Sequence, residues 1–215
     1  MVEIIPGPAY CIHTQRLVIR CWNPDDAPKL KSAIDQSLDH LLPWMPWAYN
    51  EPEDIQKKVD RLRNFRGRFD LGQDFVYGIF SKDESEVLGG TGLHTRLGID
   101  AREIGYWIRK DSINQGLATE VSAALTKVAF EIDKMRRVEI HCDPDNVRSA
   151  AVPRKLGFNH EATLRKRVPK DKDEVNWGDS MIWTLFVEDY PSTPAASIKI
   201  EVYDAMERRI MSGLS

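Results

Sequence analysis

The apolar residues of this chain change their spacing partway along it, and this change restricts the fold more than any other feature. Between residues 75 and 108 they form three short runs, 75–80, 87–93 and 104–108, separated by turn residues, which is the pattern of consecutive strands. From Leu117 to Ile132 they recur at helical spacing along one stripe. A meander of strands followed by a long helix predicts a mixed α+β (α/β class) fold.

The remaining segments extend this pattern at both ends. Strands are predicted near 16–22, 138–142, 158–167 and 178–187, and helices near 24–38, 52–65 and 146–156. Residues 1–187 are therefore expected to form a single domain. Residues 188–215 read as a C-terminal extension, with a connector around Pro191 and Pro194 and a strand or an amphipathic helix over 198–211. A docking tail, a dimer contact and a loosely held surface segment all fit this extension.

Charge and cysteine content exclude several classes of protein. Thirty Lys and Arg residues against thirty-three Asp and Glu residues give a net charge of −3, which argues against a general nucleic-acid-binding protein. No apolar run is long enough to cross a membrane, and the first residues do not look like a signal peptide, so a cytoplasmic protein is expected. Cys11, Cys21 and Cys142 are scattered, which predicts neither disulfides nor a metal site.

A glycine-containing loop after the third strand of the meander carries the first chemical signal. Residues 114–119, with Gly116 and Ala118, link the strand at 104–108 to the long helix. Such a junction points free backbone N–H groups and the positive end of the helix dipole at one place, where a diphosphate can bind. An ordinary strand-to-helix turn explains the loop equally well when it is taken alone.

A second stretch makes the pattern specific. Asn146-Val-Arg-Ser149 begins a helix, and Lys155-Leu-Gly-Phe158 ends it. Together with the Glu-Ile-Gly-Tyr-Trp-Ile strand at 103–108, the Gly-Leu-Ala-Thr-Glu loop at 116–120, and the segments 14–17 and 42–47, the chain resembles the Gcn5-related N-acetyltransferase (GNAT) superfamily. Within that superfamily it is similar to the RimJ/RimL branch, over about residues 14–187.

The resemblance implies a central, mostly antiparallel sheet of about six to seven strands, flanked by helices and splayed open to hold acetyl-CoA as cosubstrate. Gly105 fits this arrangement as a bulge or a close backbone approach. Asn146 fits a helix cap as well as a cofactor contact, and one side chain can serve both. The residues that the resemblance places at the cofactor are Tyr106, Trp107, Ile108, Gln115, Gly116, Leu117, Ala118, Thr119 and Asn146.

The resemblance also implies two catalytic residues. Glu103 is the expected general base, with an exposed strand-edge carboxylate as the alternative. Pro153 stands where the superfamily commonly has a tyrosine that protonates the leaving thiolate. Ser149 takes that role in this interpretation, with an ordinary helix-start hydroxyl as the alternative.

The acceptor side is less defined. Glu161 and His94 lie where an acceptor is expected and compete with Glu103 for the base role, while Trp44 and Trp47 either line the acceptor pocket or pack in the core. The predicted function is direct transfer of acetyl from acetyl-CoA, in a ternary complex, to a protein N-terminal α-amine or a small aminoacyl compound. The alternative is a catalytically weak acyl-CoA-binding or interaction module. Homodimers are frequent in this branch, and only the tail suggests such a contact.

Overall fold

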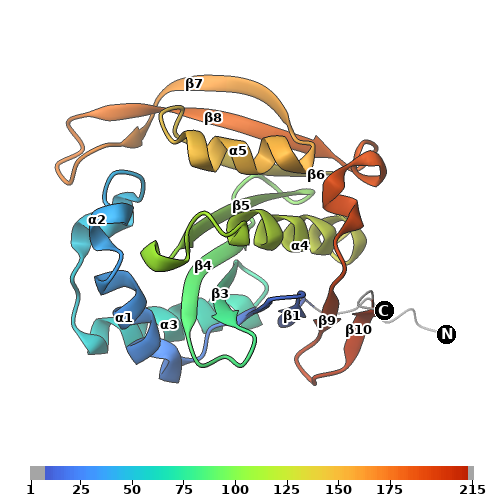
Figure 1. The fold of residues 1–215 in the computed structure, drawn as a ribbon, viewed down its shortest axis with the longest axis horizontal. Coiled ribbons are helices and arrows are strands. Elements are labelled where there is room, and N and C mark those ends of the chain that lie inside the picture. The colour runs from blue at the N-terminus through green and yellow to red at the C-terminus, as the bar shows by residue number, and fades with distance from the viewer. Residues whose placement is uncertain (1–7, 213–215) are drawn as a thin grey trace.

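The computed structural model describes residues 8–212, and these form one ten-stranded sheet with helices on both faces (Figure 1). The strand order is β10-β9-β1-β2-β3-β4-β5-β6-β8-β7. The strands are β1 (Cys11–His13), β2 (Leu17–Cys21), β3 (Phe75–Ser81), β4 (Val87–His94), β5 (Ala101–Ile108), β6 (Arg137–Cys142), β7 (Asn159–Pro169), β8 (Trp177–Phe186), β9 (Glu201–Tyr203) and β10 (Arg209–Ser212). The helices are α1 (Ala27–Asp35), α2 (Leu38–Leu41), α3 (Ile55–Asp70), α4 (Leu117–Glu131) and α5 (Val147–Leu156). Short 3-10 turns cover Pro24–Asp26, Pro46–Asn50, Lys110–Ser112, Tyr190–Ser192 and Pro194–Ser197.

The mixed α/β class is confirmed, but the expected strand number of six to seven is too low. The three additional strands are β1, β9 and β10, of three or four residues each. A segment this short shows too few alternations for its period to be recognised, and its stability comes from the strands beside it.

The C-terminal extension continues the sheet. Residues 201–203 pair antiparallel with β1, and residues 209–212 pair with β9 in turn. Ile200 and Val202 are fully buried in the main core. The segment 198–211 therefore holds two short strands and no helix, while its role as a docking element or dimer contact stays a prediction.

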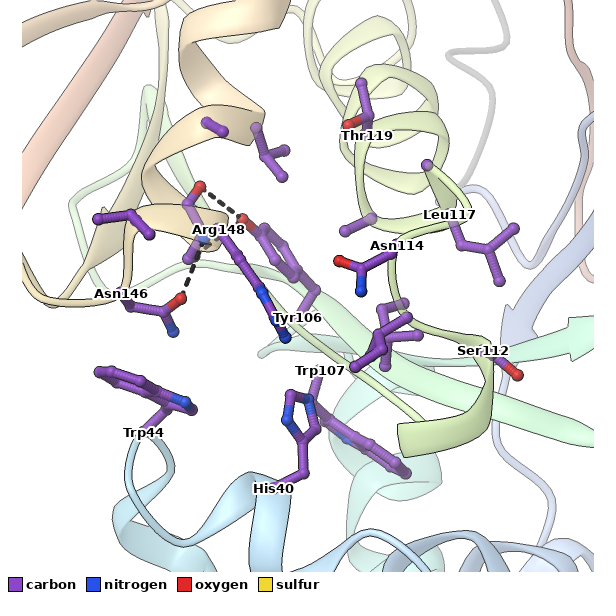
Figure 2. Close-up of a pocket in the computed structure, with 18 of the residues that line it drawn as sticks. His40, Trp44, Tyr106, Trp107, Ser112, Asn114, Leu117, Thr119, Asn146 and Arg148 are labelled. Carbon is purple, nitrogen blue, oxygen red and sulfur yellow. Dashed lines mark hydrogen bonds between the residues drawn. The ribbon is translucent and has the colours of Figure 1, made fainter.

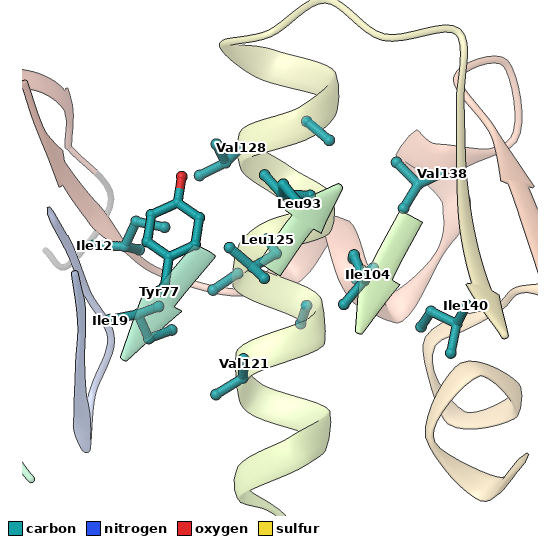
Figure 3. Packing of buried hydrophobic residues seen from close by; sticks show 14 of the residues in the cluster. Ile12, Ile19, Tyr77, Leu93, Ile104, Val121, Leu125, Val128, Val138 and Ile140 are labelled. Carbon is teal, nitrogen blue, oxygen red and sulfur yellow. The ribbon is translucent and has the colours of Figure 1, made fainter. Parts of the chain in front are cut away.

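The core is divided between the two faces of the sheet. On one face α4 presents Val121, Leu125 and Val128 to strand residues from Ile12 to Ile140 (Figure 3). On the other face α1 and α3 pack Leu30 and Leu62 in a second buried cluster. Each buried aliphatic side chain contributes about 1.5–3 kcal/mol relative to exposure. The sheet is thus a rigid platform on which the loops at its edges are held.

One strand pair separates partway along its length. β5 and β6 are parallel neighbours, and their register runs from Ala101–Arg137 to Ile104–Ile140. β5 nevertheless continues to Ile108, without a partner on its β6 side. Gly105 has a regular antiparallel register with Gly92 and forms no bulge, so the bulge that we expected there is wrong. The splayed sheet arises from the divergence of β6 after Ile140.

Asp133, in the turn after α4, gives the fold a pH dependence. Its Oδ2 lies 3.6 Å from Nε of Arg102, and burial raises its pKa to about 6 even though Arg102 lowers it. The native state therefore binds this proton more tightly than the unfolded chain, in which the pKa is about 4. Relative to Asp133→Asn, we expect the free energy of unfolding of the wild type to fall from about pH 4 to about pH 6 and to level off above. Urea unfolding of both proteins at several pH values checks this sign, and a rise with pH contradicts it.

Candidate active site

A cavity of about 460 Å³ opens where β5 and β6 part, between the first turns of α4 and α5. Its volume is in the range of small-molecule sites. Figure 2 shows Trp44 and His40 on one side and Asn146, Arg148 and Tyr106 on the other. Of the nine residues predicted at the cofactor, eight line the cavity: Tyr106, Trp107, Ile108, Gly116, Leu117, Ala118, Thr119 and Asn146. Gln115 is the exception, and its backbone carbonyl faces Arg16 instead.

The loop before α4 presents unpaired backbone donors to this cavity. Within residues 8–212, no amide from Ile113 to Thr119 donates a hydrogen bond to another group of the protein. Gly116 caps the helix with φ +79°, and Asn114 also has positive φ. The first N–H groups of an α-helix have no partner within the helix and are available to a ligand. Together with the helix dipole they make an anion site suited to a diphosphate.

Arg16 holds this loop from behind, a contact that the sequence reading missed. Its guanidinium donates to the Gln115 carbonyl at 2.9 Å and pairs with Glu120 at 2.6 Å. Glu120 also accepts a hydrogen bond from Thr14 at 2.5 Å. In the sequence, residues 14–17 stand out only as one of the segments that carry the family resemblance. Its partner Glu120 is more than one hundred residues away in sequence, so no local pattern reveals the contact.

The start of α5 supplies the side chains at the other end of the cavity. Asn146 caps the helix, with its Oδ1 accepting from the Ser149 amide at 3.0 Å, while its Nδ2 has no partner in the described chain. The capping and ligand roles are therefore compatible. The Ser149 hydroxyl lies 3.0 Å from the Tyr106 hydroxyl. Burial raises the pKa of Tyr106 far above its ordinary value, so its hydroxyl stays protonated.

Glu103 lies outside the cavity lining, on the face of the sheet away from α4. Its carboxylate is buried and accepts from two nitrogens of Arg96, the Nε contact being 2.6 Å. Burial, the largest single influence, raises the pKa of Glu103. The hydrogen bonds from Arg96, together with the charges of Arg96, His141 and His94, outweigh burial, so the pKa is lowered. His94 is the cross-strand neighbour of Glu103 and has a hydrogen bond to Asp74.

The predicted acceptor residues separate into different surroundings. Trp44 lines the cavity, and Lys170 from the β7–β8 hairpin lies over its ring at 5.7 Å. Trp47 does not line the cavity and packs edge-on against Trp107, with ring centroids 6.0 Å apart. Glu161 accepts a hydrogen bond from the buried Thr184 at 2.7 Å, also away from the cavity lining.

Neither a reactive thiol nor a metal cluster stands out in the described part of the chain. Cys142 is buried next to the site, and burial raises its pKa to about 11, so it remains a thiol. No group of three or more metal-ligating side chains occurs within residues 8–212. The same residues contain no helix long and apolar enough to cross a membrane.

Comparison with known proteins identifies the family. The family model for the acetyltransferase (GNAT) domain matches residues 16–159, more than half of the chain. The chain belongs to the GNAT acetyltransferase family. It is accordingly an N-acetyltransferase with acetyl-CoA as cosubstrate, of the RimJ/RimL-like kind.

Individual GNAT relatives are distant. The [ribosomal protein uS5]-alanine N-acetyltransferase of Escherichia coli is 25% identical over 188 residues, covering 85% of this chain and 94% of that protein. The structure of Mycobacterium smegmatis RimJ in complex with CoA-disulfide superposes with a TM-score of 0.75 at 21% identity, covering 90% of this chain and 95% of that one. The microcin C7 self-immunity acetyltransferase MccE, in complex with acetyl-CoA and AMP, gives 0.73 at 18% identity, with coverages of 80% and 93%.

The Arg16 contact leads to a test within this family. We expect Arg16→Ala to raise the KM for acetyl-CoA by about three- to fivefold without changing kcat, since an exposed ion pair contributes at most about 1 kcal/mol. Steady-state kinetics with varied acetyl-CoA measure this change. Arg63→Ala, which removes a more exposed ion-paired arginine from helix α3, outside the cavity lining, is the control. An unchanged KM in Arg16→Ala shows that the loop keeps its shape without the arginine.

Proposed function

We propose that this GNAT enzyme acetylates a primary α-amine, with the N-terminus of a protein as the first candidate and a small aminoacyl compound as the second. The amine attacks the thioester carbonyl directly in a ternary complex, and no acetyl group is carried by the enzyme. The raised pKa of Cys142 supports this order because a protonated thiol is a poor nucleophile.

One observation carries the proposal. The unpaired amides of residues 113–119 belong to the start of α4, and Ser149 belongs to the start of α5; both helix starts line the same cavity and face each other across it in Figure 2. An elongated thioester of a diphosphate carrier fits between them, with its diphosphate on the amides and its sulfur toward Ser149. The free Nδ2 of Asn146 suits the amide oxygens of the pantetheine arm.

The acceptor class follows from proton chemistry. At pH 7.5 roughly a quarter of an α-amine is neutral, but only about 0.1% of a lysyl amine, because their ordinary pKa values are about 8 and 10.4. Glu103, the carboxylate first expected as base, is neutralised by Arg96 and has a lowered pKa, and the competing Glu161 is bonded to Thr184 outside the cavity lining. Such surroundings support an acceptor that needs little help in losing its proton. The E. coli relative is named for acetylating an alanine of a ribosomal protein, which agrees with this choice.

An acceptor panel tests the proposal. We expect CoA thiol release from acetyl-CoA with peptides that begin with Ala or Ser, and a mass increase of one acetyl group at the α-amine. The same peptides with a blocked N-terminus and an internal lysine are the matched control and should stay unmodified. An aminoacyl adenylate analogue tests the second candidate. Tight CoA binding without thiol release for any amine overturns the proposal and favours the alternative, an acyl-CoA-binding module.

A further inference from the structure

His94, Glu103 and Trp107 form a row on the sheet face away from α4, and binding of the cofactor does not account for the arrangement of His94 and Glu103. Side chains alternate along β5, so that Ile104 packs in the core under α4 while Glu103, Gly105 and Trp107 lie on the opposite face. On the neighbouring strand β4, His94 shares this face as the partner of Glu103. This row begins at the cavity, because Trp107 is part of its lining.

Two glycines leave room for the His94 ring to lie flat on the sheet. A methyl group at Gly92 would lie 2.7 Å from Nε2 of His94, and one at Gly105 would lie 3.4 Å from the same atom. The next position on this face of β4, Gly90, is covered in the same way by the indole of Trp107. The imidazole thus lies over Gly105 of β5, the first residue beyond the paired part of β5 and β6. His94 itself is outside the cavity lining, and Trp107, two residues along β5 on the same face, is part of it.

Asp74 fixes the orientation of this ring. Its two carboxylate oxygens lie 3.1 and 3.2 Å from Nδ1 of His94. A carboxylate on Nδ1 holds the proton there and leaves Nε2 as an acceptor. In the described residues, Nε2 has no hydrogen-bond partner, and the His94 side chain keeps 20% of its surface exposed. Nε2 of His94, oriented by Asp74, is therefore available to accept a proton. The carboxylate of Glu103, in contrast, is already hydrogen-bonded to Arg96.

We propose that Nε2 of His94 is the general base of the acetyl transfer and that Asp74 is its positioning residue. This inference rests on the proposed function. As the amine nitrogen forms its bond to the thioester carbon, Nε2 takes the proton that the nitrogen loses. The carbon–sulfur bond then breaks, the sulfur leaves with the electron pair and takes a proton from the hydroxyl of Ser149. Solvent water returns a proton to Ser149 and takes the proton from Nε2, which restores the enzyme. The products are the N-acetyl amine and the free thiol of CoA, and no other reactant is needed.

The charged groups around His94 come from α3, β5 and the segments next to β3 and β4. Asp74 precedes β3, and Nη2 of Arg68 on α3 lies 3.6 Å from Oδ2 of Asp74. Glu103 on β5 faces the ring from the adjacent strand, with Arg96 beyond it. A base that must be unprotonated to act gives the pH–rate profile an acidic limb, which substitution can assign to a residue.

Substitution separates the two candidate bases. We expect His94→Gln to lower kcat/KM for an Ala-initiated peptide by about 10²-fold, as loss of a general base does, and to remove the acidic limb of the pH–rate profile. The Kd for CoA and the melting temperature should stay close to wild type. Glu103→Gln should lose less than tenfold and keep the acidic limb. A retained limb in His94→Gln, or its loss in Glu103→Gln alone, overturns the assignment.

Two further measurements keep the result unambiguous. His13→Gln is the matched control, since His13 lies on β1 against the ring of Tyr203, three strands away. Asp74→Asn should lower kcat and shift the acidic limb while leaving the KM for acetyl-CoA unchanged. The tautomer of His94, read by ¹⁵N NMR of histidine-labelled protein, needs no acceptor and is therefore independent of the amine panel. A proton on Nε2 at pH 7.5 overturns the base assignment, even if the enzyme acetylates its peptide.

Discussion

We expect Ser149→Ala to lower the maximal rate of acetyl transfer by about 10²-fold at saturating acetyl-CoA, because in the proposed mechanism the leaving thiolate loses its proton donor. The KM for acetyl-CoA should stay within twofold, since the amides proposed to bind the diphosphate belong to the loop before α4 and not to α5. The substitution leaves no buried group orphaned, because the Tyr106 hydroxyl keeps the Ser149 carbonyl oxygen as acceptor at 3.2 Å. Steady-state rates of thiol release measure the change, and an unchanged maximal rate removes Ser149 from the mechanism.

Tyr106→Phe decides which of the two hydroxyls is the donor. The oxygens lie 3.0 Å apart, and either can donate to the other. If Ser149 protonates the sulfur, Tyr106→Phe costs only the orientation of Ser149, about tenfold or less. A loss in Tyr106→Phe that exceeds the loss in Ser149→Ala assigns the role to tyrosine. Ser122→Ala, a buried helix serine outside the cavity lining, controls for the loss of a hydroxyl.

Gly116→Val raises the Kd for CoA by about tenfold or more and has a smaller effect on kcat. A β-branched residue is disfavoured at φ +79°, a conformation that costs an ordinary residue about 1–2 kcal/mol. The loop then rotates its amides away from the diphosphate. Only the Arg16 guanidinium lies within 4 Å of the new Cβ position, at 3.7 Å, so no clash inside the protein accounts for the change. Titration calorimetry with CoA and a melting curve measure the two effects.

Gly72→Val is the matched control for this loop. Gly72 has φ +67° and nothing within 4 Å of its Cβ position, and it follows α3 outside the cavity lining. It should lose a similar amount of stability with no change in the Kd for CoA. Equal weakening of CoA binding in both variants shows that general destabilisation, and not the diphosphate loop, is responsible.

The sequence was sufficient for the features that depend on local spacing. The position of the loop before α4 at the cavity was predictable, because a glycine before an apolar helix stripe needs only its neighbours to begin a helix. Its binding of a diphosphate stays a prediction. Ser149 and Asn146 followed because they sit three residues apart at a helix start, where capping geometry brings them together. The strands that extend the sheet beyond β2 were not predictable, because β1 and β9 have three residues each and are too short to form without each other.

The parts of the site that were not predicted depend on contacts across the sheet. Arg96 neutralises Glu103, seven positions later in the sequence, because the turn between β4 and β5 brings the residue after β4 back beside the start of β5. Asp74 meets His94 only through the register of β3 against β4. Trp44 and Trp47 are three residues apart, yet one lines the cavity and the other packs against Trp107. Residue type suggested chemistry in each case, but tertiary structure determined which groups were free to react.

Because β6 diverges from β5, binding of a ligand between them raises the free energy of unfolding. The protein alone leaves the β6 side of β5 after Ile104, and the amides of the helix-start loop, without hydrogen-bond partners in the described chain, at a cost in folding free energy. A bound ligand supplies those partners, and the gain grows as RT ln(1 + [L]/Kd). The fraction of folded enzyme is consequently coupled to the concentration of its acyl donor, so that starvation for that metabolite would weaken the protein as well as slow its reaction.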